Sequence, residues 1–221
     1  MLHKLVLVAH IAVLGYWLGS ELVINSTYRY VSWGAGMPFA ERNRLMDHVM
    51  DVDQHVRYAL LLQATLGTIL LALYGYVPGG TTLAWIAAGA GVAWLALVEA
   101  THRLRGSDLG RQLAAIDRGI RYLAVAALVA AALFAQQWFP ALPRWLAWKF
   151  AAFAGVIACG LGIRFALMDF YRTWVEIARD GSSDAREARI RRIYVQATSV
   201  LGLLWVFIAV VVALSVLKPA G

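Results

Sequence analysis

The fold is decided by residues 144–174, which read RWLAWKFAAFAGVIACGLGIRFALMDFYRTW. This stretch is longer than the roughly 20 apolar residues that a bilayer-spanning helix needs. It nevertheless contains Lys149, Arg164 and Asp169. Charged side chains inside a spanning helix are costly and usually face a bundle interior, although a lysine near a helix end also snorkels to the interface. The segment is therefore predicted to be a membrane helix that carries candidate functional residues.

The composition of the whole chain is that of a membrane protein. Of the 221 residues, 61% are hydrophobic, whereas soluble domains have about 45–50%. The net charge of +7 does not indicate a nucleic-acid partner, because the basic residues lie between the apolar runs. The single cysteine, Cys159, excludes a disulfide framework and a CxxC motif. The N-terminus lacks a small-residue cleavage site, so we expect a retained first helix.

Six apolar segments are long enough to span a bilayer. Such continuous runs favour helices over a barrel of alternating strands. We therefore expect one all-α transmembrane domain, a six-helix bundle over residues 1–221. The segments are 3–25, 57–77, 82–102, 121–139, 144–170 and 193–217.

The distribution of lysine and arginine predicts the orientation of the bundle. The connections after the first, third and fifth segments contain fifteen of these residues, and the opposite side contains three. Because basic residues accumulate in cytoplasmic connections, both termini are predicted to lie outside the cytoplasm of a bacterial-type inner membrane.

The three basic connections are predicted to be helical extensions near 38–56, 103–120 and 171–192. Pro38 precedes a run of helix formers, and proline is favoured in the first turn of a helix. Asp184 with Glu187 three residues later resembles a capping box at the start of the sixth helix.

A faint internal repeat runs through the chain. Odd-numbered segments end with an acid followed by arginine, as in Glu99 and Arg103, and even-numbered segments open with arginine beside tyrosine, as in Arg57-Tyr58. The pattern suggests three repeated helical hairpins. Any hairpin with basic inner flanks would show the same pattern.

His10 is the candidate ligand in the outer half of the first segment. A neutral imidazole at that depth is able to ligate haem iron or another metal. The alternative is a histidine that is hydrogen-bonded to a neighbouring helix. No second histidine occurs at the same depth, so a bis-histidine cytochrome has little support.

Acids and histidines gather at the inner ends of the first three segments. Residues 48, 51 and 55 share one helical face. Glu99-Ala-Thr-His102 has the Glu-x-x-His spacing of di-iron bundles. If the helices converge, the set forms a site for iron, zinc or manganese; the alternative is an ion-paired membrane boundary. The set comprises Glu21, His48, Asp51, His55, Glu99 and His102.

Two tryptophans flank Lys149 in the fifth segment. Trp145 and Trp148 are suited to form a porphyrin-facing wall. They also suit the ordinary aromatic belt of a membrane interface.

Three pieces of the chain resemble the HemJ-type protoporphyrinogen oxidases and their CopD-like relatives. They are His10 ahead of GYWLG at 15–19, RWLAWKF at 144–150, and the closing segment from Arg191 that ends in Lys218-Pro219. The resemblance implies haem b, with His10 as its ligand candidate. It also implies that Lys149 and Trp145 are porphyrin-site residues with a catalytic role. Trp148 and Arg164 are the further cofactor-binding candidates.

Three functions follow as hypotheses. The first is a haem-b membrane oxidoreductase acting on a porphyrin or quinone-like substrate, with Lys149 pairing with a propionate. The second is an enzyme or carrier with a metal site at the inner face. The third is a non-catalytic anchor subunit, because the small side chains of AVAALVAAALFA at 124–135 suit packing against a further copy or a redox partner.

Overall fold

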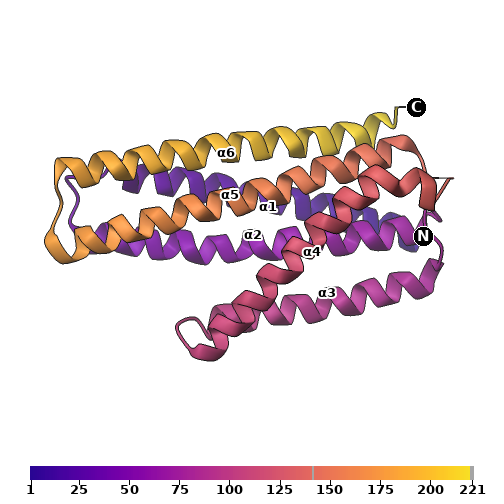
Figure 1. Cartoon of the computed structure of the whole chain (residues 1–221), viewed down its shortest axis with the longest axis horizontal. Helices are drawn as coiled ribbons and strands as arrows, with labels where there is room; N and C mark the ends of the chain where they lie inside the picture. The colour runs from indigo at the N-terminus through magenta and orange to yellow at the C-terminus, as the bar shows by residue number, and fades with distance from the viewer. Residues whose placement is uncertain (141, 220–221) are drawn as a thin grey trace. The chain divides into compact units, whose positions relative to one another are not determined.

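The computed structural model describes residues 1–140 and 142–219. Within that part of the chain the regular secondary structure consists of six α-helices and contains no strand (Figure 1). This confirms the prediction of an all-helical fold with six apolar helices. The helices are α1 (Leu2–Ser32), α2 (Phe39–Leu73), α3 (Gly80–Arg103), α4 (Asp108–Trp138), α5 (Arg144–Asp180) and α6 (Asp184–Leu217).

All six helices are long and apolar enough to cross a membrane. Their most apolar windows are only 6% to 28% buried inside the protein, so lipid is the medium that covers the remaining apolar side chains. α5 has 37 residues, which corresponds to about 55 Å of helix against a hydrocarbon core of about 30 Å. The helices therefore extend beyond the hydrocarbon.

The predicted helical extensions are present. α2 begins at Phe39, directly after Pro38, and α4 begins at Asp108. Residues 171–192 are divided between α5 and α6, which are separated by a connection of three residues, 181–183.

Two helix ends show how the backbone polar groups are satisfied. After α2, Gly75 has a φ of 73°, the amide of Gly75 bonds to the carbonyl of Ala72, and the amide of Tyr76 bonds to that of Leu71. This is a Schellman motif, and it needs glycine because other residues are strained in the left-handed region. At the start of α4 the Ser107 hydroxyl accepts from the amide of Gly110 at 3.0 Å.

The capping box predicted at Asp184 is wrong in its details. The N-cap of α6 is Ser183, whose hydroxyl accepts from the amide of Arg186. Glu187 does not reach back to the cap backbone, because its carboxylate is engaged by Arg42 and Ser182. A buried arginine thus outcompetes a local backbone donor for this carboxylate.

The chain divides into two compact units, which are described separately. The first unit contains Met1–Leu22, Asp51–Ala124 and Ala135–Leu142. The second unit contains Val23–Met50, Val125–Phe134 and the chain from Pro143 onward.

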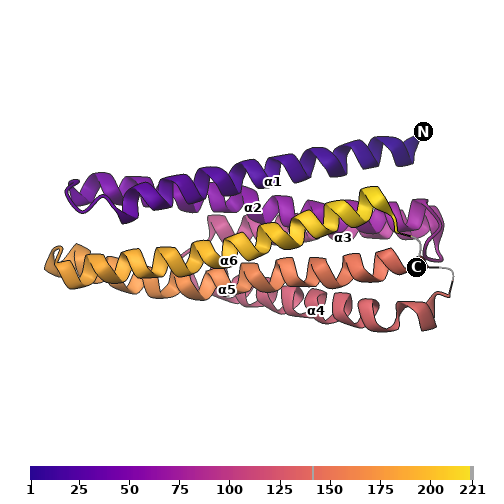
Figure 2. The same cartoon turned by 90° about the horizontal axis from the view of Figure 1, so that it is seen from above.

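An aromatic cluster forms the core of the second unit. α5 and α6 run side by side in opposite directions (Figures 1 and 2). Phe170 stacks on Trp174 with ring centroids 5.3 Å apart and an angle of 19° between the rings. Tyr28 meets the edges of Phe170 at 4.8 Å and of Tyr194 at 5.2 Å. These contacts join α1, α5 and α6 through buried rings.

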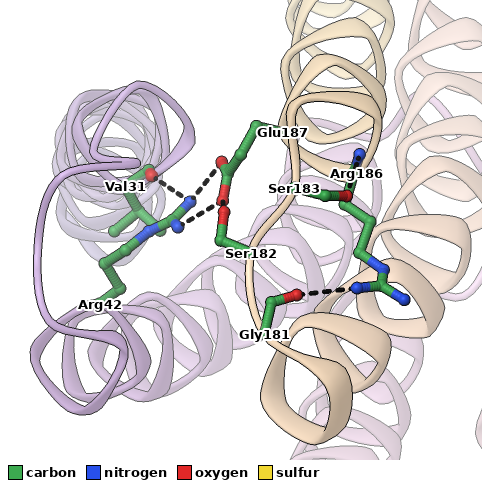
Figure 3. A network of polar contacts seen from close by, with 7 residues as sticks. All are labelled: Val31, Arg42, Gly181, Ser182, Ser183, Arg186 and Glu187. Atoms are coloured by element: carbon green, nitrogen blue, oxygen red, sulfur yellow. Dashed lines mark hydrogen bonds and ion pairs between the residues drawn. The ribbon is translucent and has the colours of Figure 1, made fainter.

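The same unit contains a buried ion pair (Figure 3). Arg42 donates to both carboxylate oxygens of Glu187, at 2.8 Å and 3.0 Å, and to the carbonyl of Val31 at 3.1 Å. Ser182 donates to Glu187 at 2.6 Å. The guanidinium carbon of Arg42 also lies 5.0 Å from the ring centre of Trp174. The side chains of Arg42 and Glu187 are only 2% and 5% exposed, so the two charges depend on each other.

Asp169 and Asn25 also have hydrogen-bonding partners within the second unit. Asp169 pairs with Arg189 of α6 at 2.6 Å. Asn25 of α1 accepts hydrogen bonds from the hydroxyls of Tyr194 and Thr198. Charged and amide side chains here therefore fasten helices to one another.

Close packing in the first unit depends on a glycine of α3. A Cβ atom at Gly91 would lie 2.5 Å from the Cγ2 and Oγ1 atoms of Thr65 in α2 and 3.0 Å from its Cβ. A Cβ atom at Gly89, on the same helix, would meet nothing within 4 Å. Small residues of this kind allow membrane helices to approach closely.

We predict that Arg42→Met lowers the free energy of unfolding by about 3–5 kcal/mol, because it leaves Glu187 buried without a counter-charge. The double variant Arg42→Met/Glu187→Met should recover most of this loss. Thermal unfolding in detergent is the measurement. Arg44→Met is the control, because Arg44 is exposed on the same helix. An Arg42→Met protein that melts with the wild type would contradict the structural role of the pair.

We also predict that Gly91→Ala destabilises the protein by about 1–3 kcal/mol through overpacking against Thr65. Gly89→Ala should be neutral or slightly stabilising, because alanine is the better helix former and the site is open. The difference in melting temperature between the two variants measures the contact. Equal melting temperatures would show that α2 and α3 do not pack at Gly91.

Candidate functional site

The six acids and histidines predicted as metal ligands do not form a ligand cluster. Among the described residues, no group of three or more His, Cys, Asp or Glu side chains is arranged to hold a metal ion. His48 belongs to the second unit and the other five belong to the first. Four of those five have other partners: Glu21, His55, Glu99 and His102.

His55 of α2 is hydrogen-bonded to Tyr16 of α1. The contact joins the Tyr16 hydroxyl to Nδ1 of His55, and the two rings meet edge to face at 5.8 Å and 89°. When Nδ1 accepts the hydroxyl proton, the neutral imidazole holds its own proton on Nε2. The pair therefore places a phenol proton directly on a base.

Glu99 of α3 is hydrogen-bonded to a second phenol. The Tyr58 hydroxyl donates to Oε2 of Glu99, and Arg103 donates to the other carboxylate oxygen. The Arg103 side chain is 76% exposed, so this end of the arrangement is open to the surroundings. A carboxylate held in this way accepts hydrogen bonds from both partners in its ionised form.

The two pairs adjoin each other on α2. The rings of His55 and Tyr58 lie one helical turn apart, with centroids 6.2 Å apart and an angle of 87°. Tyr16, His55, Tyr58 and Glu99 thus form a chain of contacts across three helices. We call these four residues the tyrosine relay.

Glu21 lies five residues after Tyr16 on α1 and is buried. Its carboxylate accepts from the indole of Trp17 at 3.2 Å. Asp53 acts on it electrostatically, and Asp53 is itself paired with Arg57 at 2.7 Å. No basic side chain of the described residues pairs with Glu21 directly. It is therefore a buried acid beside the relay rather than a metal ligand of a formed site.

The His10 ring is held against α2 within the first unit. The side chain of Gln63 donates to the backbone carbonyl of His10 at 2.8 Å. A Cβ atom at Gly67 would lie 3.6 Å from Cε1 of the imidazole. The imidazole therefore lies beside Gly67 of α2.

The porphyrin-site candidates of α5 all belong to the second unit and differ in exposure. Trp145 is buried, whereas Trp148 is 56% exposed. Lys149 and Arg164 are half-buried. Within the described residues no carboxylate forms an ion pair with Lys149. Trp145 is therefore packed inside the protein, and Trp148 lies at its surface.

Tyr16 and Tyr58 are the site residues that the sequence analysis missed as functional candidates. The only sequence signal was the spacing of His55 and Tyr58, which places both on one face of a helix. The partner of each residue lies on another helix, and a single-helix pattern does not identify it.

The helices and these contacts define a multi-pass, six-helix membrane protein with a polar relay across α1, α2 and α3. Comparisons with family models, with curated proteins and with solved structures find no match to this chain.

Proposed function

We propose that this protein is a haem-b membrane oxidoreductase that oxidises a lipid-soluble, quinone- or porphyrin-like substrate and moves the released protons through the tyrosine relay. The relay is the observation that carries the proposal. Two phenols are each hydrogen-bonded to a base, on neighbouring positions of one unit. Purely structural tyrosines need only a hydrogen-bond partner, whereas a proton path needs a succession of donors and bases.

The chemistry of the relay follows from the acidity of an oxidised phenol. When a tyrosine loses an electron its O–H proton becomes strongly acidic, and holding that charge in a low-dielectric interior is costly. The proton of Tyr16 then passes to Nδ1 of His55, and that of Tyr58 passes to Glu99. On reduction each proton returns to its phenol. The phenol thus stays neutral when it loses its electron, because its proton moves to the neighbouring base.

The substrate class follows from the surroundings. A quinol or a porphyrinogen dissolves in lipid and gives up hydrogen atoms as electron and proton pairs. A haem held by His10 would accept the electron, and Glu99, which lies beside the exposed Arg103, would hold the proton. The relay therefore serves a reaction that couples the two transfers.

His10 is the proposed ligand of the haem. It lies in the same unit as the relay, with its backbone carbonyl bonded to Gln63 and its ring beside Gly67. Imidazole is a common axial ligand of haem iron. Bound haem b would supply a one-electron oxidant.

For haem binding, we expect detergent-purified protein to show a Soret band and reduced α and β bands. His10→Ala should abolish these bands. His3→Ala is the matched control, because His3 lies on the same helix and contacts Tyr74; it should retain them. A colourless wild-type protein with an ordinary thermal transition would refute the haem assignment.

For the relay, we expect Tyr16→Phe and Tyr58→Phe each to lower the rate of quinol or porphyrinogen oxidation by roughly 10²-fold or more, as for loss of a proton-transfer group. Tyr122→Phe should leave the rate unchanged, because Tyr122 is exposed on α4. A tyrosyl radical trapped during turnover should disappear with the phenol that carries it. Wild-type rates in both relay variants would exclude the relay from the reaction.

A further inference from the structure

The end of α1 carries an open groove that the proposed redox reaction does not use. Its volume is about 510 Å³, and its lining belongs entirely to the second unit. The lining combines a cation, a hydroxyl and two aromatic rings. The residues are Ser26, Arg29, Tyr30, Trp33 and Gly34.

Arg29 gives the groove an available positive charge. Its side chain is exposed, and no carboxylate of the described residues forms an ion pair with it. By contrast, Arg42 and Arg189 of the same unit are already paired with acids, Arg42 with Glu187 and Arg189 with Asp169. A free guanidinium presents a planar set of donors that matches a phosphate.

The groove lies at the depth of the lipid headgroups. The apolar segment of α1 covers residues 3–25, and about 20 residues suffice to cross the hydrocarbon, so residues 26–34 lie at its boundary. The side chains of Tyr30 and Trp33 are 63% and 52% exposed. Tyrosine and tryptophan are enriched at this level because their rings are amphipathic.

The groove also continues toward the acyl chains. Val23, Ser26, Tyr30 and Trp33 share one face of α1 by their spacing, and Val23 is exposed. Trp33 is held in place by an edge contact to Tyr194, with ring centroids 5.1 Å apart. One face of the helix therefore offers an apolar surface, a hydroxyl and a cation in the order of a phospholipid's tail, glycerol and phosphate.

We propose that this groove binds the headgroup of an anionic phospholipid. The phosphate accepts hydrogen bonds from the Arg29 guanidinium at the level of the Tyr30 and Trp33 rings, the glycerol lies beside the Ser26 hydroxyl, and the upper acyl chains lie against Val23. The absence of any acidic side chain in the lining favours an anionic over a zwitterionic headgroup. A free anion would leave the aromatic and apolar part of the groove without a role.

The test is native mass spectrometry of the full-length protein titrated in detergent with dioleoyl phosphatidylglycerol or dioleoyl phosphatidylcholine. We expect phosphatidylglycerol to bind at least tenfold more tightly than phosphatidylcholine. Arg29→Gln should weaken phosphatidylglycerol binding by tenfold or more. Arg44→Gln, which removes an exposed arginine of the same unit outside the groove, should leave it unchanged. Arg29→Lys should give an intermediate affinity, because the charge remains and the planar donor set is lost.

Three results would overturn the proposal. Arg29→Gln and Arg44→Gln weakening binding equally would indicate a diffuse charge effect. Equal affinity for the two lipids would show that headgroup charge is not recognised. Displacement of phosphatidylglycerol by millimolar inorganic phosphate would identify a site for a soluble anion. Because Arg29 makes no protein contact that stabilises the fold, the melting temperature of Arg29→Gln should equal that of the wild type.

Discussion

The absence of water from the hydrocarbon of a bilayer is the constraint on which this structure depends. Backbone groups there must bond to one another, so every described membrane segment is a helix. The same constraint acts on polar side chains, because an unpartnered one in an apolar medium is costly. Most polar side chains of the interior are accordingly found in pairs. We therefore distinguish structural from functional positions by the kind of partner that each polar residue has.

The two units use polar residues in different ways. In the second unit, arginines form ion pairs with carboxylates: Arg42 with Glu187 and Arg189 with Asp169. The first of these pairs joins α2 to α6, and the second joins α5 to α6. In the first unit, neutral phenols meet His55 and Glu99. Transfer of one proton from the phenol to its base changes the protonation state of both groups, so such a pair is suited to proton transfer.

Much of the fold was predictable from the sequence, whereas the partners of the site residues were not. Apolar length and the position of Pro38 predict the number of helices and the start of α2, because both are local properties. The partner of Glu187 is 145 positions away in the chain, and local spacing suggested a capping role instead. Spacing along one helix reports a shared face, but a contact between helices also depends on rotation and depth. For this reason Glu99 and His55 were grouped as metal ligands, whereas each is hydrogen-bonded to a tyrosine.

The short connections between helices have a consequence for proteolysis. Four residues join α3 to α4, and three join α5 to α6. A protease must draw several residues into an extended conformation, and most arginines near these connections lie within helical turns. Apart from Arg105, which is exposed in the connection between α3 and α4, these arginines would therefore be cut by trypsin only when a helix end opens. The rate at which trypsin cleaves the folded protein would therefore measure how often a helix end opens. Because Arg42 is buried near the start of α2, that helix end should open most slowly.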